Sequence, residues 1–242
     1  MLKILHLPLF VPTFIAIIFR PLTFFREYHQ LVTTREISFW DLNAEQEGDP
    51  YLGPVKFSAL AITISNLIFP LVLLLGVQVG AISADYAAFA EWAKDQGYLN
   101  PLSFTGIGII DDFLGDILML LVFYGLGHLI AVISAGKVSA RFAAGYFFYW
   151  NAWSLLGVLI SFGMVLISLF IPLFQTGLPA VIDTLVYLAT FFMFLAFPIL
   201  FWPRIMDISW QRAAVALLGG LAIWVAAIAV LAPMIVGVPD FG

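Results

Sequence analysis

Five long apolar stretches dominate this chain and limit what it can fold into. A helix needs about 20 mostly apolar residues to cross the roughly 30 Å hydrocarbon core of a bilayer. Five stretches meet that requirement, and the segments between them are too short or too polar to do so. The predicted spans are Phe57–Val79, Phe113–Ser134, Phe147–Phe170, Val181–Trp202 and Val215–Val236.

Composition supports the same fold class. Of the 242 residues, 63% are hydrophobic and 10% are charged, whereas soluble domains carry about 45–50% apolar and about 25% charged residues. Barrel strands would be shorter and would alternate in hydrophobicity. We therefore expect an all-α polytopic transmembrane helix bundle, with a cytoplasmic or interfacial N-terminal segment at 1–56, a five-span membrane domain at 57–236 and a short tail at 237–242.

The positive residues predict how the spans are oriented, because lysine and arginine in short loops are retained in the cytoplasm. Nine of the ten fall on one side if there are five spans: Lys3, Arg20, Arg26, Arg35, Lys56, Lys137, Arg141, Arg204 and Arg212. Lys94 lies in the opposite loop, between residues 81 and 112, which is acidic. With an odd number of spans, this predicts a cytoplasmic N-terminus and a C-terminus on the other side.

The first 25 residues predict a sixth element that does not span the membrane. Leu7–Phe19 is apolar, but it is only 13 residues long and contains Pro8 and Pro12. A weakly polar stripe through Thr13, Ala16, Arg20, Thr23 and Glu27 opposes an apolar one, which predicts an amphipathic helix over Leu9–Phe25 in the membrane interface. A re-entrant segment is the alternative, and a secretory signal lacks a small-residue cleavage site here.

His128 is the only histidine inside a predicted span, and ionisable groups in a membrane are candidates for function. His6 and His29 both precede the first span, so a bis-histidine haem is not expected. One imidazole could ligate a pigment magnesium or bond a lipid headgroup, or it could donate to a carbonyl as a packed residue. We expect the structural role, and therefore no cofactor.

Other polar groups near the spans predict helix contacts rather than a metal site. Asp111, Asp112, Asp116 and Asp183 cluster toward the outer side, but the spacing of a calcium loop is missing, so we expect solvated acids and no metal. Amides within spans usually bond to neighbouring helices, each contributing about 0.6–2 kcal/mol. The amides of this kind are Asn66, Gln78 and Asn151.

Small residues and one tryptophan are further candidates for packing. Gly76 and Gly80 have the spacing that lets two helices approach closely. Gly125 and Gly127 are further small residues that would let a neighbouring helix pack close to the backbone. Trp224 lies near the middle of the fifth span, away from the interface where tryptophan concentrates. Its N–H needs a partner, which predicts a contact between helices or subunits.

Several functional classes lack sequence support. The chain has no cysteine, and no nucleophile triad, phosphate loop, zinc-protease or dinucleotide motif occurs. We therefore expect no enzymatic activity, and the charge distribution gives no reason to expect nucleic acid as a partner. A transporter would usually carry charged groups at mid-depth in several spans. The second hypothesis for this chain is therefore a small transporter or channel whose path is lined by Asp116, His128, Asn66 and Asn151.

Three segments resemble the Yip family of five-span membrane proteins, which are named for interaction with Ypt/Rab GTPases. They are Gly125-Leu-Gly127-His128-Leu-Ile-Ala, Ser134-Ala-Gly136-Lys137-Val-Ser-Ala and Gly145-Tyr146-Phe-Phe-Tyr149. The segments ahead of the first span, Phe19-Arg20-Pro21 and Pro54-Val-Lys-Phe57, also resemble the family's pattern of an amphipathic segment before five spans. The resemblance implies five spans after a cytoplasmic N-terminus, and the short N-terminal segment implies a bacterial-type relative in the cytoplasmic (inner) membrane.

The leading hypothesis is a non-enzymatic scaffold or accessory subunit of a larger membrane assembly. Its expected partners are the lipid bilayer and other membrane subunits or further copies of this chain. A small transporter or channel is one alternative. Membrane remodelling by a wedge-like helix at Leu9–Phe25 is another, which matches the traffic and membrane-shaping roles that the family resemblance implies.

Overall fold

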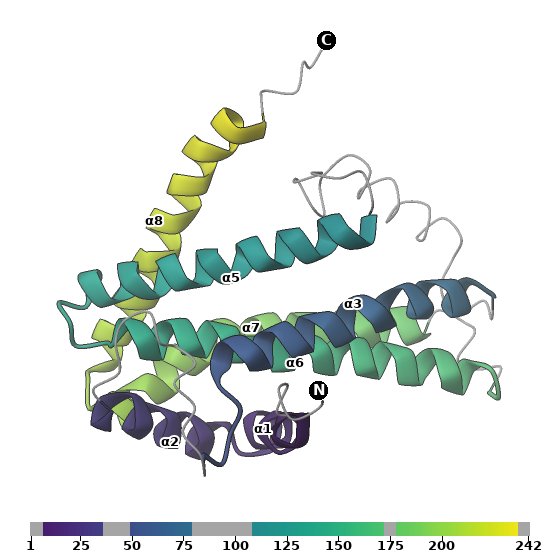
Figure 1. Ribbon diagram of the computed structural model, residues 1–242, viewed down its shortest axis with the longest axis horizontal. Coiled ribbons are helices and arrows are strands. Elements are labelled where there is room, and N and C mark those ends of the chain that lie inside the picture. The colour runs from purple at the N-terminus through teal and green to yellow at the C-terminus, as the bar shows by residue number, and fades with distance from the viewer. Residues whose placement is uncertain (1–6, 36–48, 79–107, 172–177, 237–242) are drawn as a thin grey trace. The chain divides into compact units, whose positions relative to one another are not determined.

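A computed structural model describes residues 7–35, 49–78, 108–171 and 178–236, and these ranges contain helices and no strand. The elements, shown in Figure 1, are α1 (Leu7–Phe19), α2 (Pro21–Thr34), α3 (Pro54–Gln78), α5 (Gly108–Ile133), α6 (Ala140–Ser168), α7 (Leu178–Met206) and α8 (Trp210–Val236). The all-α prediction is confirmed.

Five helices are long and apolar enough to cross a membrane, which confirms the predicted number of spans. They cover Pro54–Gln78, Phe113–Ile133, Ala140–Ser168, Thr184–Met206 and Trp210–Val230. Helix α6 begins at Ala140, before the predicted start at Phe147, and Phe142 and Ala143 in its first turn are already fully buried. The chain is therefore an integral membrane protein built as a helix bundle.

The N-terminal element differs from the single helix predicted over Leu9–Phe25. It consists of α1 and α2, whose axes are bent by 119° at a break between Phe19 and Pro21. Proline has no N–H to continue a helix, and its ring clashes with the carbonyl four residues earlier. Arg20 accordingly leaves helical geometry, with φ −138° and ψ 50°, and Pro21 starts α2. By length and composition the bent pair could count as a sixth, broken span.

The chain divides into two compact units, each assembled from several segments. Unit 1 contains Met1–Ala59, Leu118–Trp150 and Phe194–Gly242, and unit 2 contains Leu60–Ile117 and Asn151–Met193. Helices α1, α2 and α8 belong to unit 1, while α3, α5, α6 and α7 each contribute one end to either unit.

Unit 1 is organised around an aromatic core formed by Tyr28, Phe142, Tyr146, Tyr149 and Trp202, all of which are buried. Tyr28 meets Phe142 and Tyr149 at centroid distances of 5.9 and 5.2 Å, and Tyr146 meets Trp202 edge-on at 5.4 Å. Aromatic pairs at these separations contribute about 0.5–1.5 kcal/mol each beyond the area they bury. The core therefore joins α2, α6 and α7.

The turn after α5 is fixed by its own hydrogen bonds. Ala135 and Gly136 both have positive φ, 51° and 74°, and the Gly136 N–H donates to the Ala131 carbonyl at 2.9 Å. The Ser134 hydroxyl donates to the same carbonyl and accepts from the Val138 N–H, both at 3.0 Å. This is a typical glycine-assisted helix end, and it holds Lys137 at a defined place.

Candidate functional site

The short segment before α3 is held by hydrogen bonds from two helices of unit 1. Leu52 is fully buried outside any helix, so its backbone groups need partners within the protein. The Leu52 N–H donates to the Thr13 hydroxyl at 2.9 Å, and the Leu52 carbonyl accepts from the Tyr149 hydroxyl at 2.7 Å. Two side chains thus connect α1, the segment before α3, and α6.

Helix α2 is seated against α6 through Tyr28. Its hydroxyl donates to the Arg141 carbonyl at 3.3 Å, and burial raises the pKa of the Tyr28 phenol well above its usual range. Gly145 makes room for this ring, because a Cβ at that position would lie 1.9 Å from the Tyr28 hydroxyl oxygen. A larger residue at position 145 would force the Tyr28 ring, or the helix that carries it, to shift.

The outward faces of α1 and α2 have opposite character. On α1, Val11, Ile15 and Phe19 are exposed, with Phe19 75% accessible. On α2, the exposed residues are Thr23, Arg26, Glu27, Gln30, Thr33 and Thr34. The predicted polar stripe is therefore reversed on α1, where Thr13 and Ala16 are buried in the protein. An apolar outward face matches a lipid environment, and a polar one matches a membrane surface.

Asn66 and Asp116, two residues of the proposed transport path, are bonded to one another in unit 2. The Asn66 amide nitrogen donates to the Asp116 carboxylate at 2.8 Å, joining α3 to α5. This agrees with the interhelical role expected for the amide. Asn151 also lies in unit 2 and is half-buried.

His128 lies on α5 and is half-buried. Its ring packs at an angle against Tyr124 one helical turn earlier, with centroids 5.0 Å apart. That contact is compatible with the packed role that we expect, and a ligand role for His128 stays the alternative. No group of three or more potential metal ligands occurs among the residues described, and the side chains of Asp111, Asp112 and Asp183 lie outside that description.

The predicted packing glycines fall into different environments. A Cβ on Gly127 would lie 2.7 Å from the Ala144 backbone nitrogen and 2.9 Å from the Ala140 carbonyl oxygen, so α5 and α6 approach closely there. Gly125 has nothing within 4 Å of such a Cβ. Gly76 is buried on α3, and Gly80 lies outside the described residues. The small-residue contact is thus made by Gly127.

Helix α8 changes character along its length. In its first half Ala213, Ala216 and Leu217 are fully buried, and a Cβ on Gly220 would lie 2.7 Å from the Ile130 side chain on α5. Residues 222–230, here called the exposed half of α8, are all exposed except the half-buried Trp224. Sequence analysis identified Trp224 but missed the surrounding exposure.

One buried donor of the aromatic core has no acceptor. Trp202 is fully buried, and its Nε1 has no hydrogen-bond partner among the residues that the structure describes. A buried unpaired donor costs about 1–3 kcal/mol. The ring therefore contributes through its packing against Phe142 and Tyr146.

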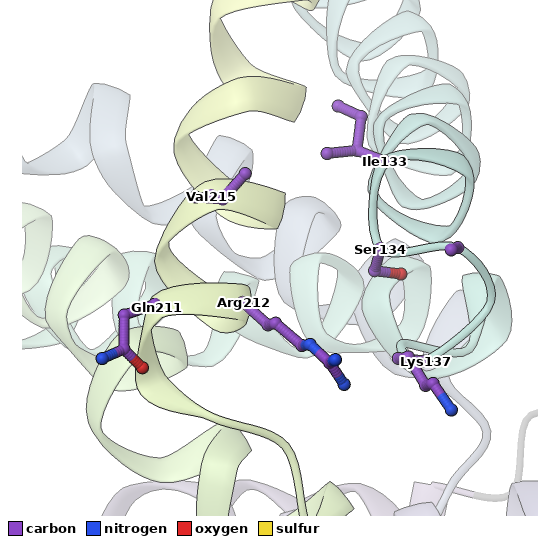
Figure 2. Close-up of a pocket in the computed structure, with 7 residues that line it drawn as sticks. Ile133, Ser134, Lys137, Gln211, Arg212 and Val215 are labelled. Carbon is purple, nitrogen blue, oxygen red and sulfur yellow. The ribbon is translucent and has the colours of Figure 1, made fainter.

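A cavity of about 330 Å³ opens where the α5–α6 turn meets the start of α8. Its lining combines apolar and cationic residues: Ile133, Ser134, Ala135, Lys137, Gln211, Arg212 and Val215. Figure 2 shows Arg212 extending from α8 toward the turn that carries Lys137, with Ile133 and Val215 further along their helices. The charge count included both cations, but residues 75 positions apart carry no local signal of their proximity.

Comparison of the chain with family models, with curated proteins and with solved structures finds no match. The resemblance to the Yip family therefore stays a prediction that depends on the motif residues alone.

Proposed function

We propose that this protein is a non-enzymatic scaffold or accessory subunit of a larger membrane assembly, in a bacterial cytoplasmic membrane and with a cytoplasmic N-terminus. The exposed half of α8 is the observation that carries the proposal. Where the described residues leave a transmembrane helix exposed, it can meet either lipid or a partner helix. Its residue pattern favours the partner helix.

The pattern is a stripe of small residues on one face. Ala222, Ala226 and Ala229 follow one another at steps of four and three, which places them on one side of the helix, and all three are exposed. Small residues allow helix backbones to approach closely in a membrane, where dispersion contacts and lipid release drive association. The same chain already uses this device internally, at Gly127 against Ala140 and Ala144.

Native mass spectrometry of the protein released from its own membrane tests the proposal. We expect a mass above that of one 26.8 kDa chain with bound lipid, either from a different subunit or from further copies. Ala226→Phe should abolish this species, because a ring on the small face keeps a partner helix away. Ala227→Phe is the matched control, since it adds the same ring about 100° around the helix.

Two results would contradict the proposal. One is a chain that is always released as monomer plus lipid. The other is an assembly that survives Ala226→Phe as well as it survives Ala227→Phe.

Membrane remodelling is a second candidate, favoured by the opposite outward faces of α1 and α2. The outward face of α1 is apolar and that of α2 is polar, so the pair could insert into one leaflet of the bilayer and push the lipid headgroups of that leaflet apart. Purified protein added to vesicles should then change their curvature in electron micrographs, and Phe19→Ser should weaken the effect. Thr23→Ser, on the polar outward face, is the control, and unchanged vesicles would exclude this function.

Transport has weaker support because polar groups of the spans are bonded within the protein. Thr190, Ser161 and Ser168 donate to carbonyls of their own helices at 2.6, 3.0 and 2.9 Å, and Asn66 donates to Asp116. Solute flux into liposomes that contain the parent protein, and its loss in Asp116→Asn or His128→Ala, would favour transport over the scaffold role.

A further inference from the structure

The cavity between the α5–α6 turn and the start of α8 has a charge pattern that the scaffold role does not require. Lys137 and Arg212 are both exposed, and neither has an ion-pair partner among the residues described by the structure. Two cations that face one cavity repel each other unless an anion lies between them. The lining thus favours an anionic ligand.

The rest of the lining indicates which kind of anion. Ile133 lies at the end of α5, before the turn that carries Lys137, and Val215 lies on α8 beyond Arg212 (Figure 2). Val215 is 61% exposed. The neighbouring apolar residues Val132 and Leu218 are 76% and 50% exposed. A ligand with a charged head and an apolar chain would match both ends of this surface, whereas a small free anion would use the cationic end alone.

The two helices place this change of polarity at a membrane boundary. Both Ile133, the last residue of α5, and Val215, in the second turn of α8, belong to spanning helices. Lys137 follows the end of one span, and Arg212 stands in the first turn of another. Basic pockets between transmembrane helices at the cytoplasmic side are suited to the head groups of anionic lipids.

We infer that this cavity binds the phosphate of an anionic phospholipid through Arg212 and Lys137, with an acyl chain lying along Ile133 and Val215. Arginine offers a planar fork that matches a phosphate group, and lysine adds a second positive charge. The site is independent of the exposed half of α8, so it can exist whether or not the protein assembles with partners.

Photolabelling tests the site directly. The full chain is reconstituted in nanodiscs of phosphatidylcholine that contain a phosphatidylglycerol probe with a photoreactive acyl chain. We expect label on the peptides around Ile133 and Val215, and competition by unlabelled phosphatidylglycerol. At roughly 1 kcal/mol per cation, Lys137→Gln with Arg212→Gln should weaken apparent binding about 30-fold.

Controls separate this site from general attraction to a charged membrane. Arg204→Gln removes an exposed cation from α7 outside the cavity and should leave the labelling of these peptides unchanged. Arg212→Lys should retain much of it. The melting midpoints of the variants should match that of the parent, since the substituted side chains are exposed.

Two outcomes would overturn the inference. Equal labelling of the double variant and Arg204→Gln would show that the two cations do not hold the lipid. Displacement of the probe by inorganic phosphate, but not by chloride at the same ionic strength, would show that the cavity takes a free anion instead.

Discussion

The aromatic core of unit 1 and the exposed half of α8 are both built mainly from hydrophobic residues, but the core side chains are buried in the protein and those of α8 are exposed. In the core, Tyr28, Tyr146 and Tyr149 are buried, and glycine at position 145 provides the space for a neighbouring ring. In the exposed half of α8, Val225 and Val230 are 57% and 65% exposed. Hydrophobicity alone cannot distinguish the two regions, because lipid satisfies an apolar side chain as well as protein does.

The difference lies in polar bonds and small residues with a defined partner. Core tyrosines place their hydroxyls on particular carbonyls, as Tyr149 does on Leu52, and such bonds fix one arrangement of the helices. Alanines of the exposed half have no polar atom beyond the backbone. Substitutions in the core should therefore change folding stability, and those on α8 should change association.

The largest effect is expected from Gly145→Ala. Its Cβ would lie within 2.6 Å of three atoms of the Tyr28 ring and hydroxyl, and overpacking of this kind costs about 1–3 kcal/mol. Unfolding by titration with SDS, followed by circular dichroism, should show that loss. Gly125→Ala has open space and should show none, while Tyr28→Ala should cost less in the Gly145→Ala background than in the parent, because the clash is then relieved. Equal stabilities of the two glycine variants would break the comparison.

The next effect is expected from Tyr149→Phe. The substitution leaves the buried Leu52 carbonyl without its side-chain donor, which costs about 1–3 kcal/mol. Tyr51→Phe is the matched control, because its hydroxyl donates to Glu27 at 2.8 Å in an exposed position where water can replace it. The same SDS titration should separate the two variants, and a loss at Tyr51 as large as that at Tyr149 would contradict this explanation.

The spans were predictable from sequence because their length is set by the membrane. The break at Arg20 had a visible cause in Pro21, yet the amphipathic pattern suggested one continuous helix. Burial of Thr13 had no such signal, because its partner Leu52 lies 39 residues away and in a segment without regular structure. Asn66 was correctly expected to bond to another helix, although the sequence did not identify Asp116 as its partner.

Candidate sites were harder to predict than spans for the same reason. Gly127 and Gly125 look alike in sequence, and only the position of α6 makes one of them a close contact. Lys137 and Arg212 contributed to the charge count, while their shared cavity depends on how the ends of α5 and α8 come together. Periodicity reports which face of a helix is apolar, and it does not report what covers that face.

On α8, Ala226→Phe should leave stability within about 0.5 kcal/mol of the parent, since exposed substitutions away from special features rarely exceed that. This is the counterpart of Gly145→Ala, in which a single methyl group is expected to cost more than a whole ring does here. Thermal melting of the purified chain in detergent provides the measurement. A marked loss of stability would mean that this face of α8 is packed within the chain, and the comparison between the two regions would fail.

The smallest effect expected is a pH dependence at the edge of the core. His29 lies edge-on to Phe142, with centroids 5.3 Å apart, and burial lowers the pKa of its imidazole from the usual 6.5. The unfolded chain then binds a proton more readily than the folded one, so stability should fall as the pH drops below about 6.5. The difference in melting midpoint between the parent and His29→Gln, followed from pH 7 downward, isolates this contribution from that of the carboxylates. A difference that stays constant with pH would place His29 outside the packed core, and the boundary of the core would then run between Tyr28 and His29.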